Sequence, residues 1–161
     1  MEIRVAVEGA KELQAALARV EKAAVREVVS AINITALHVQ NELKEETSNA
    51  RAINTGTLRN SWHIAKATQS SMTARVGTNL VPHYAPDVEY GTRPHRPPIG
   101  ALKLWAKRKL HNEKAAYPIA KKIARRGTSG RHIFAKGIND AAHVLEQELA
   151  RAARAIEGEW G

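Results

Sequence analysis

Residues 11–46 contain neither proline nor glycine and carry apolar side chains at helical spacing. The apolar residues follow one another at intervals of three, four or seven: Leu13, Leu17, Val20, Ala24, Val28, Ile32, Val39 and Leu43. Such spacing places one apolar stripe along an α-helix. The pattern therefore predicts one long helix from Lys11 to about Glu46. Because 36 residues at 1.5 Å each would span about 54 Å, we expect it to bend near residues 33–35 or to project from the body.

Strand-like segments lie on both sides of this helix. Ile3, Val5 and Val7 alternate with charged residues before Gly9, as in a short strand. Residues 62–68 and 72–78 flank a polar turn at 69–71 and fit a β-hairpin. We expect the three strands to form a small antiparallel sheet, with the long helix covering one of its faces.

The C-terminal half shows helical patterns again. Residues 99–110 predict a short helix with Leu102, Trp105 and Leu110 on its apolar side, and Lys103, Lys107, Arg108 and Lys109 exposed. A second helix is predicted from Ala116 to Arg125, followed by a glycine-flanked loop at 126–130. Residues 131–158 predict one amphipathic helix, with apolar side chains that include Phe134, Ile138, Leu145 and Leu149.

The fold class predicted is therefore α+β: a small antiparallel β-sheet packed against a long N-terminal helix, with further helices in the C-terminal half. The chain length fits a single domain over 1–161. Its segments are the strand and long helix (1–47), the hairpin and a proline-rich loop (52–98), a basic helical insertion (99–126) and a C-terminal helix (131–158).

The composition excludes several classes of functional site. The absence of cysteine excludes thiolate nucleophiles, disulfides and cysteine-based zinc sites. No apolar run is long enough for a membrane span or a secretion signal, so we expect no membrane partner and a protein that stays soluble in the cytoplasm.

The positive charge is concentrated in the middle of the chain. The net charge is +9, yet residues 51–138 hold 17 Lys and Arg against 3 Asp and Glu, and residues 93–136 hold 13 against Glu113 alone. This segregation predicts contact with nucleic acid or with an acidic protein surface. No helix-turn-helix or other reading motif accompanies it, so any DNA contact would be independent of sequence. The alternative is a solvated helical face.

Two groups of residues raise the question of catalysis. His83, Asp87, Glu89 and His95 have the chemistry of metal ligands, but their spacing matches no known ligand motif. Five of the six prolines lie in the same stretch, residues 82–98, and favour a fixed extended loop. Ser61 and His63 share a strand face but lack a third orienting group and a nucleophile elbow. A small metal-dependent hydrolase stays open as an alternative.

Three segments carry a family resemblance through their order: NTGTLRNSWHI at 54–64, HYAPDVEYGTRPHRPP at 83–98 and IARRGTSGRHIFAKGINDA at 123–141. Together they resemble the neck and tail-completion proteins of tailed bacteriophages, the gene-ten family of lambda-like phages. Members show a TGxLxxS motif, then a YAxxVExGT loop, then a GT loop that leads to an aromatic residue and a final helix. The resemblance covers roughly residues 50–141.

The resemblance implies a structural virion protein of the phage neck, assembled in the host cytoplasm and without enzymatic activity or cofactor. It would join head to tail or complete the tail, as part of a homo-oligomeric ring of six or twelve copies through which DNA passes. Its neighbours would be head-completion or connector proteins and tail-terminator or tail-tube proteins, with double-stranded DNA as a candidate partner in the lumen. A sequence-independent nucleic-acid-binding protein is the alternative.

The matching positions are interpreted as scaffold or interface residues: Thr55, Gly56, Leu58, Ser61, Tyr84, Ala85, Val88, Glu89, Gly91, Thr92, Gly127, Thr128 and Phe134. We expect Gly56 and Gly91 to permit tight turns and Leu58 to enter the core. The ring of Tyr84 is expected to be buried, and Glu89 to pair with Arg93 or with an arginine of a neighbouring subunit. Candidate contacts to DNA or to an acidic partner are Lys107, Arg108, Arg125 and Arg126.

Overall fold

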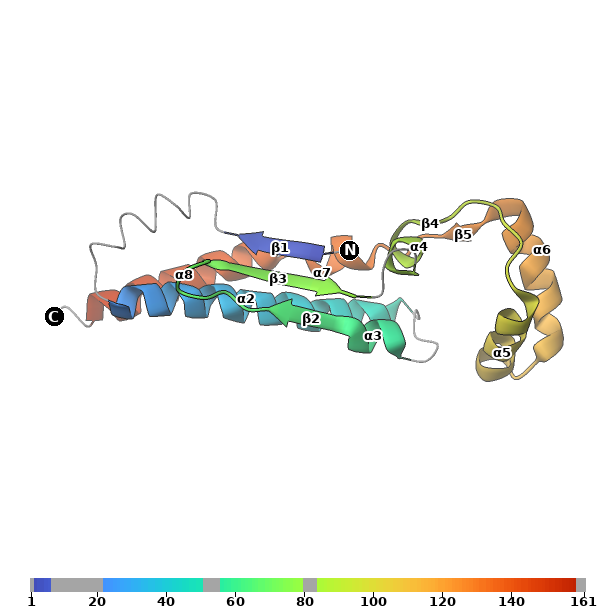
Figure 1. Cartoon of the computed structure of the whole chain (residues 1–161), viewed down its shortest axis with the longest axis horizontal. Coiled ribbons are helices and arrows are strands. Elements are labelled where there is room, and N and C mark those ends of the chain that lie inside the picture. The colour runs from blue at the N-terminus through green and yellow to red at the C-terminus, as the bar shows by residue number, and fades with distance from the viewer. Residues whose placement is uncertain (1, 7–21, 51–55, 80–83, 159–161) are drawn as a thin grey trace.

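The structure is a computed structural model that describes residues 2–6, 22–50, 56–79 and 84–158 (Figure 1). Its central element is helix α2 (Lys22–Asn49), whose 28 residues span about 42 Å. The helix is uninterrupted through residues 33–35 and ends three residues beyond the predicted Glu46. The predicted first turns, at 11–21, lie outside the described residues.

A three-stranded antiparallel sheet lies against α2, as the sequence predicts. Strands β1 (Glu2–Ala6), β2 (Trp62–Ala65) and β3 (Thr73–Thr78) are ordered β1-β3-β2, and Ile3 and Ile64 both pair with Val76. The hairpin strands are shorter than predicted, because residues 66–72 form the connection. Asn33 of α2 holds that connection: its Nδ2 donates to Ala67 O (3.2 Å) and its Oδ1 accepts from Ala67 N (2.8 Å).

The core lies between α2 and the sheet. Its buried apolar side chains come mainly from α2, β2, β3, the short helix α3 (Thr57–Ser61) and the short helix α7 (Ile133–Gly137). They include Ile32, Val39, Leu43, Leu58, Trp62, Val76 and Phe134. Burial of Leu58 confirms its predicted place in the core. Two buried hydroxyls on α2 are satisfied within the helix, since Thr35 donates to Ala31 O and Thr47 to Leu43 O.

The predicted C-terminal helix is two helices, so the expectation of one continuous helix over 131–158 is wrong. Helix α7 (Ile133–Gly137) and helix α8 (Ala141–Gly158) are separated by a turn at 138–140. Gly137 crosses α2 closely: a Cβ there would lie 2.7 Å from Leu43 Cδ2. Beyond the turn, α8 packs along α2 (Figure 1).

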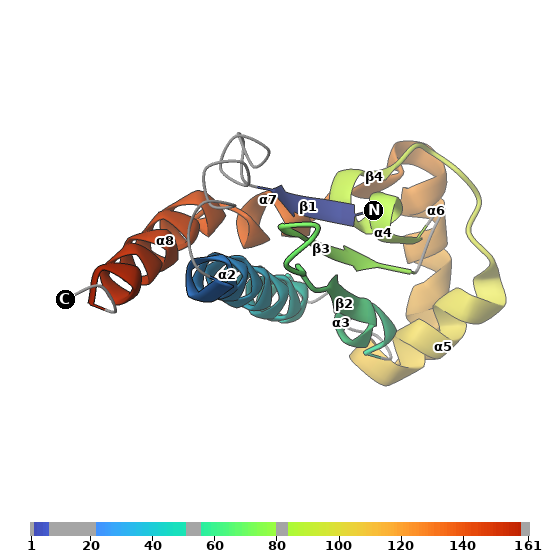
Figure 2. The ribbon, with the colours of Figure 1, turned by 60° about the vertical axis from the view of Figure 1, so that its left-hand side comes forward.

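Residues 91–130 form a hairpin-like extension, called the arm below, that leaves one end of the remaining structure, the body (Figures 1 and 2). Its base is a two-stranded ribbon of β4 (Gly91–Thr92) and β5 (Thr128–Ser129). Its tip contains α5 (Ile99–Leu110), the 3-10 turn η1 (Glu113–Ala115) and α6 (Ala116–Arg126). Both arm helices match their predicted positions within one residue.

Two loop predictions are wrong at the base of the arm. The proline-rich stretch is not wholly extended, because Tyr84–Tyr90 form helix α4. Pro86 lies in the first turn of α4, where the missing N–H costs no helical hydrogen bond. The glycine-flanked loop at 126–130 contains strand β5.

Candidate functional site

The helices of the arm carry an unusual charge. Residues 91–130 contain 11 Lys and Arg and one acidic residue, Glu113. Lys107 pairs with Glu113 at 3.3 Å. Lys103 lies 5.2 Å from the centroid of the Tyr117 ring, and hydrogen bonding to Tyr117 raises the pKa of Lys103 above its ordinary value. Two of the eleven cations therefore have a partner within the arm.

The other nine cations are exposed and have no acidic partner within the part of the chain that the structure describes. They are Arg93, Arg96, Arg108, Lys109, Lys114, Lys121, Lys122, Arg125 and Arg126. The predicted contact residues Lys107, Arg108, Arg125 and Arg126 are all exposed. The arm is thus a charged surface of one sign, held away from the body.

The arm has a small apolar interior of its own. Ala106 and Ala116 are buried where α5 and α6 pack, and Leu102 and Trp105 are half-buried. Two assignments on α5 differ from the prediction, because Leu110 is exposed and Lys103 is half-buried beneath Tyr117. Trp105 packs within the arm and does not belong to the main core cluster.

The second and third sequence motifs pair with each other at the base of the arm. Thr92 lies opposite Thr128, the N–H of each donates to the hydroxyl of the other (3.1 and 3.2 Å), and the two hydroxyl oxygens are 3.0 Å apart. Gly91 and Gly127 have positive φ, at 80° and 68°. A Cβ on Gly127 would lie 1.8 Å from Thr92 O, so only glycine fits this close backbone approach.

Glu89 fastens the same junction to the body. Its side chain is only 3% exposed, and its carboxylate accepts hydrogen bonds from the backbone N–H groups of Phe134 (2.8 Å) and Ala135 (3.3 Å) at the start of α7. Beside it, Arg131 N donates to Val88 O and His132 N to Glu89 O. Glu89 therefore orders the chain between arm and body, and does not pair with Arg93 as expected. The name arm junction is used below for Glu89, Gly91, Thr92, Gly127, Thr128 and Phe134.

We expect Glu89→Gln to lower the free energy of unfolding by about 1–3 kcal/mol, because the amide nitrogen would face a buried N–H donor and leave it unsatisfied. Urea denaturation measures this change. The matched control is Glu45→Gln on the exposed side of α2, which is expected to stay within about 0.5 kcal/mol. Equal stabilities of the two variants would contradict the assigned role of Glu89.

The first motif joins the third through an aromatic contact. The rings of Trp62 and Phe134 meet edge to face, with centroids 4.8 Å apart, and Trp62 Nε1 donates to Thr47 Oγ1 at 3.0 Å. Ser61 Oγ donates to Leu58 O (2.7 Å) and lies 2.6 Å from Thr78 Oγ1. Residues from all three motifs thus converge around α2, which their order along the chain did not reveal.

The predictions for three other motif positions have different outcomes. Gly56 has a φ of 80°, which confirms the predicted turn. Tyr84 is 48% exposed, so the prediction that its ring is buried is wrong. Thr55 lies outside the described residues.

The catalytic alternatives lack an assembled site. Among the described residues no three candidate ligands gather around a metal position, His83 lies outside them, and Glu89 is occupied by α7. His63 Nδ1 lies 3.2 Å from the backbone carbonyl of Ser61, while the Ser61 hydroxyl donates to Leu58 O. Neither arrangement prepares a nucleophile.

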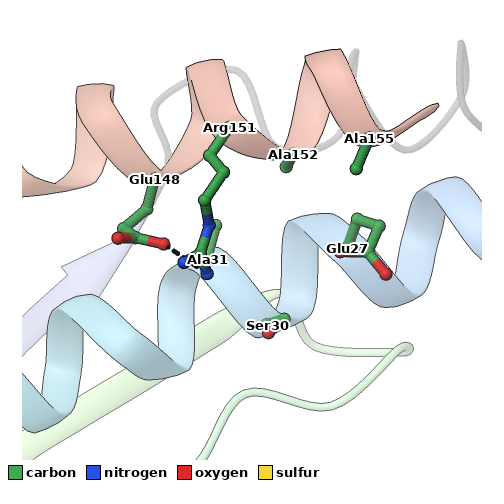
Figure 3. Close-up of a pocket in the computed structure, with 7 residues that line it drawn as sticks. All are labelled: Glu27, Ser30, Ala31, Glu148, Arg151, Ala152 and Ala155. Atoms are coloured by element: carbon green, nitrogen blue, oxygen red, sulfur yellow. Dashed lines mark ion pairs between the residues drawn. The ribbon is translucent and has the colours of Figure 1, made fainter. Parts of the chain in front are cut away.

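A cavity of about 230 Å³ lies between α2 and α8 (Figure 3). Its lining consists of Glu27, Ser30, Ala31, Glu148, Arg151, Ala152 and Ala155. Arg151 Nη2 forms an ion pair with Glu148 Oε2 at 2.8 Å, although the geometry of the contact is not that of a hydrogen bond. Glu27 Oε1 lies 3.5 Å from Arg26 Nε. With its carboxylates already beside arginines and its wall made of small side chains, this cavity is a packing gap between two helices.

Comparison with known families matches the part of the chain that contains α2, the hairpin strands and α4. A family model described as "Bacteriophage HK97-gp10, putative tail-component" matches residues 11–91, just over half of the chain. The match ends at the first residue of β4, so the rest of the arm lies beyond it. Comparison with curated proteins and with solved structures found no match. None of the described helices is both long and apolar enough to cross a bilayer. The chain belongs to the HK97-gp10-like family of bacteriophage tail components.

Proposed function

We propose that the chain is a non-enzymatic subunit of a homo-oligomeric ring in the virion neck, where it joins head to tail or completes the tail while DNA passes through the ring. The observation that carries this proposal is a body whose residues 11–90 fall within the match to a tail-component family, joined to a projecting arm. In a ring, every subunit meets its neighbours through two different surfaces. An arm that leaves one end of the body supplies a surface distinct from the body itself.

Exposed apolar side chains support an assembled role. Leu37 on α2 and Leu104, Leu110 and Tyr117 on the arm are all about half exposed or more. Large exposed apolar side chains gain free energy when a neighbouring protein covers them. The proposed neighbours are further copies, six or twelve in the ring, together with head-completion or connector proteins and tail-terminator or tail-tube proteins.

Deletion of the gene from the phage that encodes it tests the proposal. We expect the lysate to contain heads and tails that are not joined, visible by negative-stain electron microscopy, and a plasmid copy of the wild-type gene to restore joined infectious particles. The matched control is a synonymous recoding of the same gene. Normal joined particles from the deletion phage would overturn the proposed function.

A further inference from the structure

We propose that the outer side of α6 binds the phosphate backbone of double-stranded DNA without reading its sequence. The residues that form this basic face are Lys121, Lys122, Arg125 and Arg126. The inference rests on the proposed function for the source of the DNA, since a neck ring places the chain beside the DNA path. The binding itself is a property of the purified chain and can be measured without particles.

The spacing along α6 gathers four cations on one side of the helix. Lys121, Lys122, Arg125 and Arg126 occupy positions i, i+1, i+4 and i+5, and all four are exposed. Residues four apart lie above one another, about 6 Å apart along the axis. The opposite side of α6 is apolar, with Ala116 buried and Ile119 and Ile123 half-buried. The helix therefore packs on α5 and presents its cations outward.

The arm differs from the body in how its charges are compensated. The body pairs Glu2 with Arg75, Glu46 with Lys136 and Glu148 with Arg151. The arm pairs one cation with Glu113 and leaves nine exposed cations without an acidic partner. On α6, neighbouring cations lie within a Debye length of about 8–10 Å, so salt does not remove their mutual repulsion. A polyanion relieves this repulsion and releases its own counterions on binding.

The composition of the basic face favours DNA over an acidic protein. Lysine supplies two of its four cations, and lysine is depleted from protein–protein interfaces, whereas both lysine and arginine bind phosphates. The four outward residues of α6 include no apolar side chain. The nearby Tyr117 ring is already in contact with Lys103. Apart from Tyr117, α6 exposes no large apolar side chain, so a protein interface centred on its four cations would have only a small apolar core.

The test is fluorescence anisotropy of a labelled 30-base-pair duplex with the purified full-length chain over a series of NaCl concentrations. The α6 variant combines Lys121→Gln, Lys122→Gln, Arg125→Gln and Arg126→Gln. Glutamine keeps helix propensity and removes charge. The matched control makes the same change to glutamine at four cations of the body, Lys44, Arg59, Lys66 and Arg154. Circular dichroism and light scattering check that both variants keep the fold and mass of the wild type.

We expect wild type and control to bind the duplex with similar affinity, and the α6 variant to bind at least about sixtyfold more weakly at 0.1 M salt. Each lost phosphate contact costs about eightfold there, so the loss of only two of the four contacts already gives about sixtyfold. The slope of log Kobs against log[salt] should fall in magnitude by up to about 3.6, or about 0.9 for each of four contacts. A random-sequence duplex should bind equally well.

Three results would overturn the inference: no binding of the wild type at 50 mM salt, an equal loss in the control, or an α6 variant that keeps the wild-type slope. If the wild type does not bind DNA and phage carrying the α6 variant yield unjoined heads and tails, the basic face contacts a protein. Failure of the proposed function is observed separately, as normal particles from the gene deletion. The two failures are therefore distinguishable.

Discussion

Gly127→Ala is expected to open the base of the arm while the body stays folded. Gly127 has φ 68° and ψ −156°, a region essentially restricted to glycine, and its Cβ would meet Thr92 O at 1.8 Å and the Arg93 carbonyl carbon at 2.9 Å. Both are backbone atoms, so no change of side-chain rotamer relieves the clash. The substitution should cost at least about 3 kcal/mol at the ribbon, from backbone strain and lost hydrogen bonds.

Limited trypsin digestion followed by mass spectrometry measures this opening, because the arm is rich in Lys and Arg. A cost of about 3 kcal/mol should raise the rate of cleavage within 91–130 by roughly a hundredfold, when cleavage follows local opening. The matched control is Gly100→Ala in α5, where an added Cβ meets nothing within 4 Å. The control should match or exceed wild-type resistance, since alanine favours the helix. Cleavage of the Gly127 variant at the wild-type rate would contradict the assigned role of the ribbon.

Periodic elements could be predicted from sequence, and non-periodic contacts could not. The long helix, the hairpin and both arm helices follow from spacing over ten or more residues, or from strands around a polar turn. Strand β5 has only two residues, too short for any repeating pattern, and its partner β4 lies 36 residues away. Helix α4 was missed because Pro86 and its neighbouring prolines favour an extended chain, whereas a proline in the first helical turn costs little.

In the candidate site, too, features that follow from helical periodicity were predictable and long-range contacts were not. The exposure of Lys107, Arg108, Arg125 and Arg126 was predictable, because a helix with an apolar side must place its charges opposite. The role of Glu89 was not, since its partners are backbone amides 45 and 46 residues away and leave no mark in the sequence. Gly91 was expected at a tight turn, but the structure places it in strand β4 with a φ of 80°, and Gly127 lies immediately before the paired strand β5.

The arm junction also bears on domain organisation. Glu89, Val88 and Phe134 lie in the body, and buried or backbone hydrogen bonds at these residues link the chain segment that enters the arm to the segment that leaves it. The tip, in contrast, packs mainly on itself, α5 against α6 and η1. We propose that body and arm fold as a single domain, with the tip as its least stable part. Hydrogen exchange should then be faster in 99–126 than in α2.

Trp62→Ala is expected to have the largest effect on the stability of the body. The side chain is 3% exposed, meets Phe134 edge to face and donates its indole N–H to Thr47. Its truncation removes a large buried aromatic group and leaves a cavity, which should lower the free energy of unfolding by about 3–5 kcal/mol. A domain of this size is stable by only about 5–15 kcal/mol, so much of its stability would be lost.

Urea unfolding followed by circular dichroism measures this loss, and a double-mutant cycle with Phe134→Ala isolates the ring contact. The two substitutions should be non-additive by about 0.5–1.5 kcal/mol, since each removes the same edge-to-face pair. Tyr90→Ala is the matched control, because this aromatic side chain is 69% exposed and its loss should change stability by less than about 1 kcal/mol. A cost below about 1 kcal/mol for Trp62→Ala, or strict additivity with Phe134→Ala, would show that the first and third motifs do not stabilise each other. The expected result would instead show that one core holds both the sheet and α7 against α2. Because Glu89 binds the start of α7, the base of the arm would depend on that same core.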